Sequence, residues 1–100
     1  MAKLDLRAKD LDTLRRTFGR FPFVRSVRVF GSRADGSARP TSDIDLAIWA
    51  PDASTTEWND LVEAIEEAPI IYALDLVRPD DHTDPRLLER IEREGIPIWP

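Results

Sequence analysis

The apolar positions of the chain follow first a helical and then a strand-like period. We expect a helix over roughly residues 5–18, because apolar side chains recur there every three or four residues and a glycine follows them: Leu4, Ala8, Leu11, Leu14, Phe18 and Gly19. The segment 23–30 then alternates apolar and polar residues, as a strand does. Residues 31–41 are rich in Gly, Ala, Ser and Pro, and we expect turns there.

The second half of the chain repeats the alternation of strand and helix. Residues 43–49 and 70–77 predict two strands, which end at Pro51 and Pro79. Between them, a capping-box pattern and an apolar stripe predict a helix that stops at Pro69: Ser54 and Glu57, then Trp58, Leu61, Val62 and Ile65. Asp84, Pro85 and Gly95 frame a last helix, and residues 96–99 predict a short edge strand. This order predicts an α/β fold with a small mixed β-sheet flanked by helices.

The length and composition are those of an ordinary globular domain. A chain of 100 residues with 42% hydrophobic and 33% charged residues is expected to form one domain, residues 1–100. It has no cysteine, no apolar run that could span a membrane and no signal-peptide pattern, which predicts a cytoplasmic protein without disulfides.

The net charge of -5 is distributed unevenly along the chain. Residues 1–33 hold nine Lys or Arg and three Asp, whereas residues 34–100 hold five Arg and sixteen acids. The acidic balance argues against nucleic acid as a direct partner. The basic first third is either a solvated helix face or a surface for phosphates or an acidic partner.

Two carboxylates lie within the strand predicted at 43–49. Side chains of a strand alternate between its faces, so Asp43 and Asp45 project from one side and Ile44 and Leu46 from the other. The two like charges repel each other, and Asp is a poor strand former. Mg²⁺ takes oxygen ligands and commonly binds one or two carboxylates together with phosphates and water. The pair therefore predicts a magnesium site.

Asp75 repeats the anomaly inside the strand predicted at 70–77. If the two strands are neighbours, Asp43, Asp45 and Asp75 converge on one face. Three carboxylates on one face are typical of a two-metal site for phosphoryl transfer, in which one ion activates the attacking oxygen and the other neutralises phosphates. The alternative for Asp75 is a salt bridge to Arg28 or Arg78.

Gly31 and Ser32 close the first predicted strand. A glycine at a strand end lets the backbone approach a phosphate closely, and the serine hydroxyl and the following amides provide donors. We interpret Gly31-Ser32 as a phosphate-binding turn; the alternative is a plain turn.

Polar residues near this turn admit two interpretations each. Arg33 and Arg39 either contact phosphates or are solvated loop arginines, and Ser42 either binds the nucleotide or caps the entry to the strand. His82 lies in a polar loop, where we expect it to be exposed. The three tryptophans are expected in the core, with a protein interface as the alternative for Trp99.

The stretch Gly31-Ser32-Arg33-Ala34-Asp35-Gly36 followed by Ser42-Asp43-Ile44-Asp45-Leu46-Ala47-Ile48 resembles the signature of the DNA polymerase β-type nucleotidyltransferase superfamily. Within it, the chain is most similar to the minimal nucleotidyltransferases of prokaryotes. The resemblance runs from about residue 24 to the C-terminus and includes Leu74-Asp75-Leu76-Val77. One departure is Asp35, where relatives often carry Arg or Lys.

The resemblance implies the polymerase β-like fold and nucleotide transfer with Mg²⁺, and the transfer that it implies is that of AMP from ATP. It implies Asp43, Asp45 and Asp75 as catalytic and metal-binding residues, and Gly31, Ser32, Arg33 and Ser42 as nucleotide-binding residues. It also implies a hetero-oligomer with an all-helical HEPN-domain toxin, in which the nucleotidyltransferase is the antitoxin and adds AMP to a tyrosine of its partner.

Two functional classes follow from these observations. The first is an active transferase that modifies a partner protein, and the second is a non-catalytic antitoxin that neutralises its partner by occlusion. The complete carboxylate set favours the first. An antibiotic nucleotidyltransferase is disfavoured because the chain leaves no room for an aminoglycoside-binding domain, and RNA-directed chemistry is disfavoured by the acidic balance.

Overall fold

The computed structural model describes residues 4–100. The elements along this part of the chain are α1 (Ala8–Gly19), β1 (Ser26–Phe30), α2 (Ser32–Asp35), β2 (Ile44–Trp49), α3 (Thr55–Glu67), β3 (Leu74–Val77), α4 (Pro85–Glu94) and β4 (Ile96–Trp99). No helix in residues 4–100 is long and apolar enough to cross a membrane.

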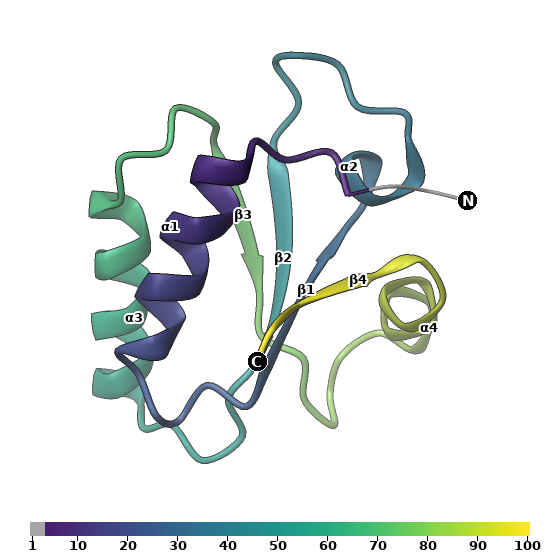
Figure 1. Ribbon diagram of the computed structural model, residues 1–100. Helices are drawn as coiled ribbons and strands as arrows, with labels where there is room; N and C mark the ends of the chain where they lie inside the picture. Colours follow the sequence, from purple (N-terminus) through teal and green to yellow (C-terminus); the bar gives the residue numbers. More distant parts are fainter. Residues whose placement is uncertain (1–3) are drawn as a thin grey trace.

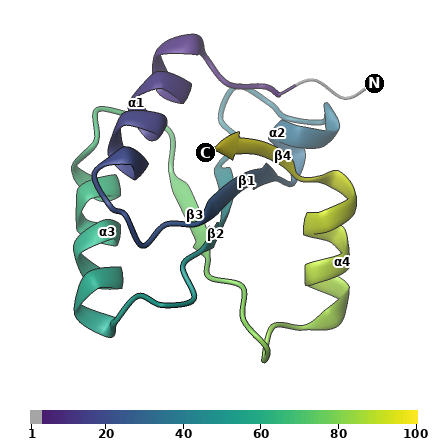
Figure 2. The ribbon, with the colours of Figure 1, turned by 60° about the horizontal axis from the view of Figure 1, so that its bottom comes forward.

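The strands form one sheet in the order β3-β2-β1-β4. β2 pairs with β3 in parallel, whereas β1 pairs antiparallel with both β2 and β4. The helices α1 and α3 lie side by side on one face of this sheet and α4 lies on the other (Figures 1 and 2). The expected α/β fold, with a small mixed sheet flanked by helices, is therefore confirmed.

The alternation of side chains along β2 divides the interior into two parts. Ile44, Leu46 and Ile48 are fully buried in the larger core between the sheet and the α1–α3 layer. Ala47 belongs to a smaller cluster on the opposite face, together with Phe30 and with Ile91 of α4. The residues between the buried ones, Asp45 among them, therefore lie on the α4 face of the sheet.

The predicted helix starts are confirmed by their caps. The Ser54 hydroxyl accepts a hydrogen bond from the Glu57 N–H at 3.1 Å, and the Glu57 carboxylate accepts one from the Ser54 N–H at 2.9 Å, which completes the capping box of α3. The Asp84 carboxylate accepts a hydrogen bond from the Arg86 N–H at 2.8 Å and starts α4. These local bonds satisfy N–H groups that the helices cannot pair internally.

The structure shortens three predicted strands and adds one helix. β1 begins at Ser26 rather than at residue 23, and β2 begins at Ile44, so Asp43 lies just before the strand. The strand expected over 70–77 begins only at Leu74, because β2 begins at Ile44 and offers no partner to residues 70–73. The first helix begins at Ala8 rather than near residue 5, since the Asp5 N–H donates to the Arg33 carbonyl instead of starting a helical turn. The turn-prone stretch after Phe30 contains the short helix α2.

Candidate active site

Asp45 and Asp75 are direct register partners in the parallel pairing of β2 with β3. Both side chains lie on the α4 face of the sheet, because their strand neighbours on either side pack into the opposite core. Asp43 precedes Asp45 by two residues and is exposed, as is Asp75, whereas Asp45 is half-buried. The alternative for Asp75 fails within residues 4–100: it forms no ion pair there, and Arg78 and Arg28 donate to backbone carbonyls instead.

The electrostatic effect of this cluster is resolved at Asp45, the half-buried carboxylate. Burial raises the pKa of the Asp45 carboxyl, and the negative charges of Asp75 and Asp43 raise it further. The positive charge of Arg90 acts in the opposite direction. A carboxylate with this surrounding is stabilised by a nearby cation, so the cluster suits a positively charged ligand.

Gly31 is packed directly against this cluster. It follows Phe30, which pairs in register with Asp45 across β1 and β2. Its φ of 73° lies in the region that favours glycine, and a Cβ at this position would overlap the Asp45 carboxylate oxygen Oδ2. The backbone turn at Gly31 and Ser32 is therefore held beside the carboxylates. No other residue type would fit there without moving Asp45.

Arg33 occupies a different position from the one that its loop context suggested. Its side chain is buried, with 4% of the residue exposed. The guanidinium donates to the carbonyls of Ser42, at 2.7 Å from Nη2, and of Asp5, at 3.1 Å from Nη1, and it lies 4.2 Å from the centre of the Tyr72 ring. A direct phosphate contact would require these bonds to break, so we assign Arg33 to holding the loop in place.

Ser42 has a comparable role in the loop before β2. Its hydroxyl accepts a hydrogen bond from the Arg39 N–H at 2.9 Å, and its carbonyl accepts the bonds from Arg33. These contacts fit the alternative in which Ser42 shapes the entry to the strand. Arg39 is exposed on the same loop, and His82 is exposed as expected.

Sequence reasoning did not single out Arg90, although its charge reaches the site. Arg90 lies on α4, next to Ile91, which packs against the sheet, and it forms an ion pair with Glu94 at 3.3 Å. The pKa of Asp35 is lowered mainly by hydrogen bonds from Ser37, and Arg90 lowers it as well. Arg90 is near the carboxylates because α4 packs on the same face of the sheet. The sequence of α4 does not tell which face of the sheet the helix covers.

The donor set fits a hard divalent cation. Carboxylate oxygens are the ligands that Mg²⁺ prefers, and the crowding of negative charge at Asp45 favours such an ion. Within residues 4–100, no three His, Cys, Asp or Glu side chains are grouped closely enough to hold a metal ion as they stand. The structure thus brings Asp45 and Asp75 together, and the closure of all three carboxylates around one ion stays a prediction.

Comparison with known proteins identifies the fold family. The profile of the family described as polymerase beta, nucleotidyltransferase matches residues 12–100. The chain belongs to this family. The match contains β1, the Gly31-Ser32 turn and all three carboxylates, so the site lies within the part that defines a nucleotidyltransferase. No curated protein matches the chain.

Solved structures with the same fold include components of toxin–antitoxin systems. A chain in the crystal structure of a toxin–antitoxin with AMP-PNP has a TM-score of 0.65 and 22% identity, over 90% of this chain and 73% of that one. A chain of the toxin–antitoxin MntA-HpeT in mutant form has a TM-score of 0.60 and 22% identity, over 94% and 73%. A chain in the complex of the tri-AMPylated Shewanella oneidensis HEPN toxin with MNT antitoxin has a TM-score of 0.51 and 23% identity, over 91% and 66%.

Proposed function

We propose that this nucleotidyltransferase moves AMP from ATP to a hydroxyl of a partner protein, and that it acts as the antitoxin of a HEPN-type toxin. The observation that supports the proposed transferase activity is the proximity of three residues. Asp75 is the register partner of Asp45, and the Gly31 backbone packs on the Asp45 carboxylate. Family membership supports the same chemistry.

Each carboxylate has its own role in this proposal. Asp43 and Asp45 hold the metal associated with the nucleotide, and Asp75 orients the acceptor hydroxyl and accepts its proton. Two bound Mg²⁺ ions would neutralise the phosphates and activate the acceptor oxygen. The acceptor oxygen forms a bond to the α-phosphorus of ATP, the bond from that phosphorus to the bridging oxygen breaks, and pyrophosphate leaves.

The nucleotide phosphates are proposed to lie at Gly31 and Ser32. The turn runs beside Asp45, so phosphates bound there would share a cation with that carboxylate. Arg33 and Ser42 stabilise this arrangement, since the hydrogen bonds from the Arg33 guanidinium to the Ser42 carbonyl hold the loop that leads into β2. Their contribution to nucleotide binding is therefore indirect in this proposal.

The partner assignment is supported by the solved relatives. One was crystallised as a toxin–antitoxin with AMP-PNP, and another as an MNT antitoxin with a tri-AMPylated HEPN toxin. We extend this pairing to the present chain as a hetero-oligomer with a helical HEPN toxin. AMP on a tyrosine near the toxin's active site would add negative charge and bulk where RNA phosphates bind, and the toxin would be silenced.

Intact-mass spectrometry of the co-expressed partner tests this function. The wild-type pair is expected to yield toxin that carries AMP, and the Asp43→Asn/Asp45→Asn variant is expected to yield unmodified, active toxin. A matched variant, Asp52→Asn/Asp81→Asn, removes two exposed carboxylates away from the site and should modify the toxin normally. If the toxin is neutralised without any adduct in all three pairs, occlusion is the mechanism and the enzymatic proposal is wrong.

A further inference from the structure

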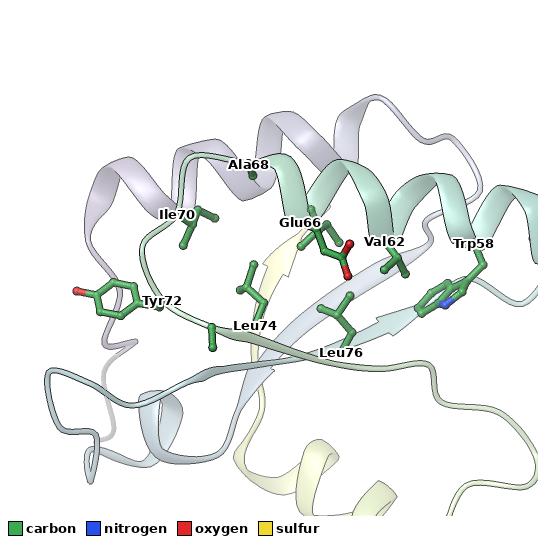
Figure 3. Close-up of a pocket in the computed structure, with 10 residues that line it drawn as sticks. Trp58, Val62, Glu66, Ala68, Ile70, Tyr72, Leu74 and Leu76 are labelled. Carbon is green, nitrogen blue, oxygen red and sulfur yellow. The ribbon is translucent and has the colours of Figure 1, made fainter.

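A groove of about 500 Å³ lies between α3 and β3, on the face of the sheet opposite the carboxylates. Side chains from both elements and from the segment between them point into it, as Figure 3 shows. Most of the residues that line it have apolar or aromatic side chains; the main contributors are Trp58, Val62, Ile70, Tyr72, Leu74 and Leu76. Among residues 4–100, Glu66 of α3 is the only charged residue that lines the groove.

The groove opens beside an unpaired strand edge. β3 is the last strand of the sheet, and within residues 4–100 no strand pairs with its outer side. The Ile44 N–H donates to the Ala73 carbonyl at 2.9 Å, and alternate residues of a parallel strand bond to the same neighbour. The N–H and C=O groups of Leu74 and Leu76 therefore face away from β2. Ile71, just before this edge, is 77% exposed.

The helix that forms one wall of the groove is acidic, and Glu66 is its acid that lines the groove. α3 carries Glu57, Asp60, Glu63, Glu66 and Glu67 and contains no Lys or Arg. Its last turn has no basic residue, although acids there interact unfavourably with the helix dipole. No ion pair within residues 4–100 involves any of these five acids. α3 is therefore a negatively charged wall of the groove, whereas the guanidinium groups of Arg78 and Arg33 lie over the Trp58 and Tyr72 rings.

The charge distribution selects the kind of occupant. A second copy that paired through the same edge would place two acidic α3 helices next to each other, and their like charges would oppose association. A basic partner would relieve the repulsion along α3. The exposed backbone groups of Leu74 and Leu76 favour an extended segment over a helix, because a strand can bond to both.

We propose that this groove binds an extended, basic segment of a partner protein. The segment adds a strand to the free edge of β3, places alternate apolar side chains beneath α3, and directs a Lys or Arg to Glu66. This interaction uses neither the carboxylate cluster nor the Gly31 turn. It therefore stands independently of the transfer reaction.

Selection from a phage-displayed library of random octapeptides tests the proposal. The enriched peptides, called winners below, are then synthesised and their affinity is measured by calorimetry. The winners are expected to alternate apolar residues with Lys or Arg. Glu66→Lys should weaken their binding about tenfold or more, since it removes a charge-assisted contact. Asp81→Lys reverses an exposed acid elsewhere and should change affinity less than about twofold. N-methylation of the backbone amides that face β3 should abolish binding, and β3 amides should exchange more slowly in the complex.

Several results would overturn this assignment. They are the absence of any enriched peptide, enrichment of acidic peptides, affinity unchanged by Glu66→Lys, or insensitivity to N-methylation, which would indicate a helical ligand. Sedimentation that shows a dimer of this chain, lost in Glu66→Lys, would replace the partner segment by a second copy. Circular dichroism establishes that each variant is folded before its binding is interpreted.

Discussion

The backbone of Gly31 lies so close to the carboxylate of Asp45 that a single added carbon atom would overlap Oδ2. The contact joins two segments that meet because Phe30 and Asp45 are register partners across β1 and β2. It also couples the turn that we assign to phosphates with the carboxylate that we assign to the metal. A change at either residue should therefore be felt at the other.

Gly31→Ala tests this coupling. The substitution strains a positive φ, which costs about 1 kcal/mol, and it also displaces Asp45. We expect nucleotide transfer to fall by about 100-fold or more, well beyond the loss of stability. Gly36→Ala is the matched control, since Gly36 has a φ of 88° and no atom of residues 4–100 lies within 4 Å of the position that its Cβ would take. Equal loss of activity in both variants, measured alongside urea denaturation, would contradict a role for the Gly31–Asp45 contact.

Asp45→Asn should stabilise the protein in the absence of divalent ions. A raised carboxyl pKa means that folding disfavours the ionised form, so the charge lowers stability at neutral pH and the amide removes that penalty. Because solvent screens part of the repulsion, we expect a gain of about 0.5 kcal/mol in the free energy of unfolding. Urea denaturation in EDTA measures it, with Asp81→Asn as control. Added Mg²⁺ should stabilise the wild type more than Asp45→Asn, and equal stabilisation would argue against this metal ligand.

Asp75→Asn should separate chemistry from nucleotide binding. If Asp75 orients or deprotonates the acceptor hydroxyl, kcat should fall by about 100-fold, while ATP·Mg²⁺ affinity changes little. Single-turnover transfer gives the first quantity and calorimetry the second. A variant that binds ATP poorly but transfers normally at saturation would show that Asp75 serves the nucleotide instead.

Arg33→Ala should destabilise the fold. It removes the buried guanidinium that donates to the carbonyls of Ser42 and Asp5, and we expect a loss of about 2–3 kcal/mol in the free energy of unfolding. Arg39→Ala removes an exposed arginine from the same loop and should change stability by less than about 0.5 kcal/mol. If Arg33→Ala kept full stability and lost only ATP affinity, the guanidinium would contact phosphate directly after all.

The sequence predicted the elements of the fold because apolar periodicity is a local property. The apolar stripe correctly predicted α3, and the alternation of apolar and polar residues correctly predicted β2. The same alternation placed Asp45 on the face opposite Leu46. The strand expected over 70–77 was too long, since apolar residues without a pairing partner do not form a strand. Strand ends depend on the neighbour, which a single segment does not reveal.

Features of the site that depend on distant pairing were not visible in the sequence. In the sequence, nothing distinguishes Arg33 from a solvated loop arginine. Its hydrogen bonds to the carbonyls of Asp5 and Ser42 exist only in the folded chain. Arg90 lies about half the chain away from Asp45 in sequence and approaches it only because α4 covers that face of the sheet. The candidate site residues were therefore found from the local motif, whereas the residues that hold them in place were visible only in the tertiary structure.

The alternation of side chains along β2 has an evolutionary consequence. The core residues Ile44, Leu46 and Ile48 project from one face of the strand, and Asp45 projects from the other, as does its register partner Asp75 on β3. Mutation can therefore replace the carboxylates to which we assign catalysis while the residues of the core stay the same. A lineage that gained neutralisation by binding alone could lose its enzyme activity step by step and keep the same scaffold, so active and inactive descendants of this fold would be hard to tell apart by shape.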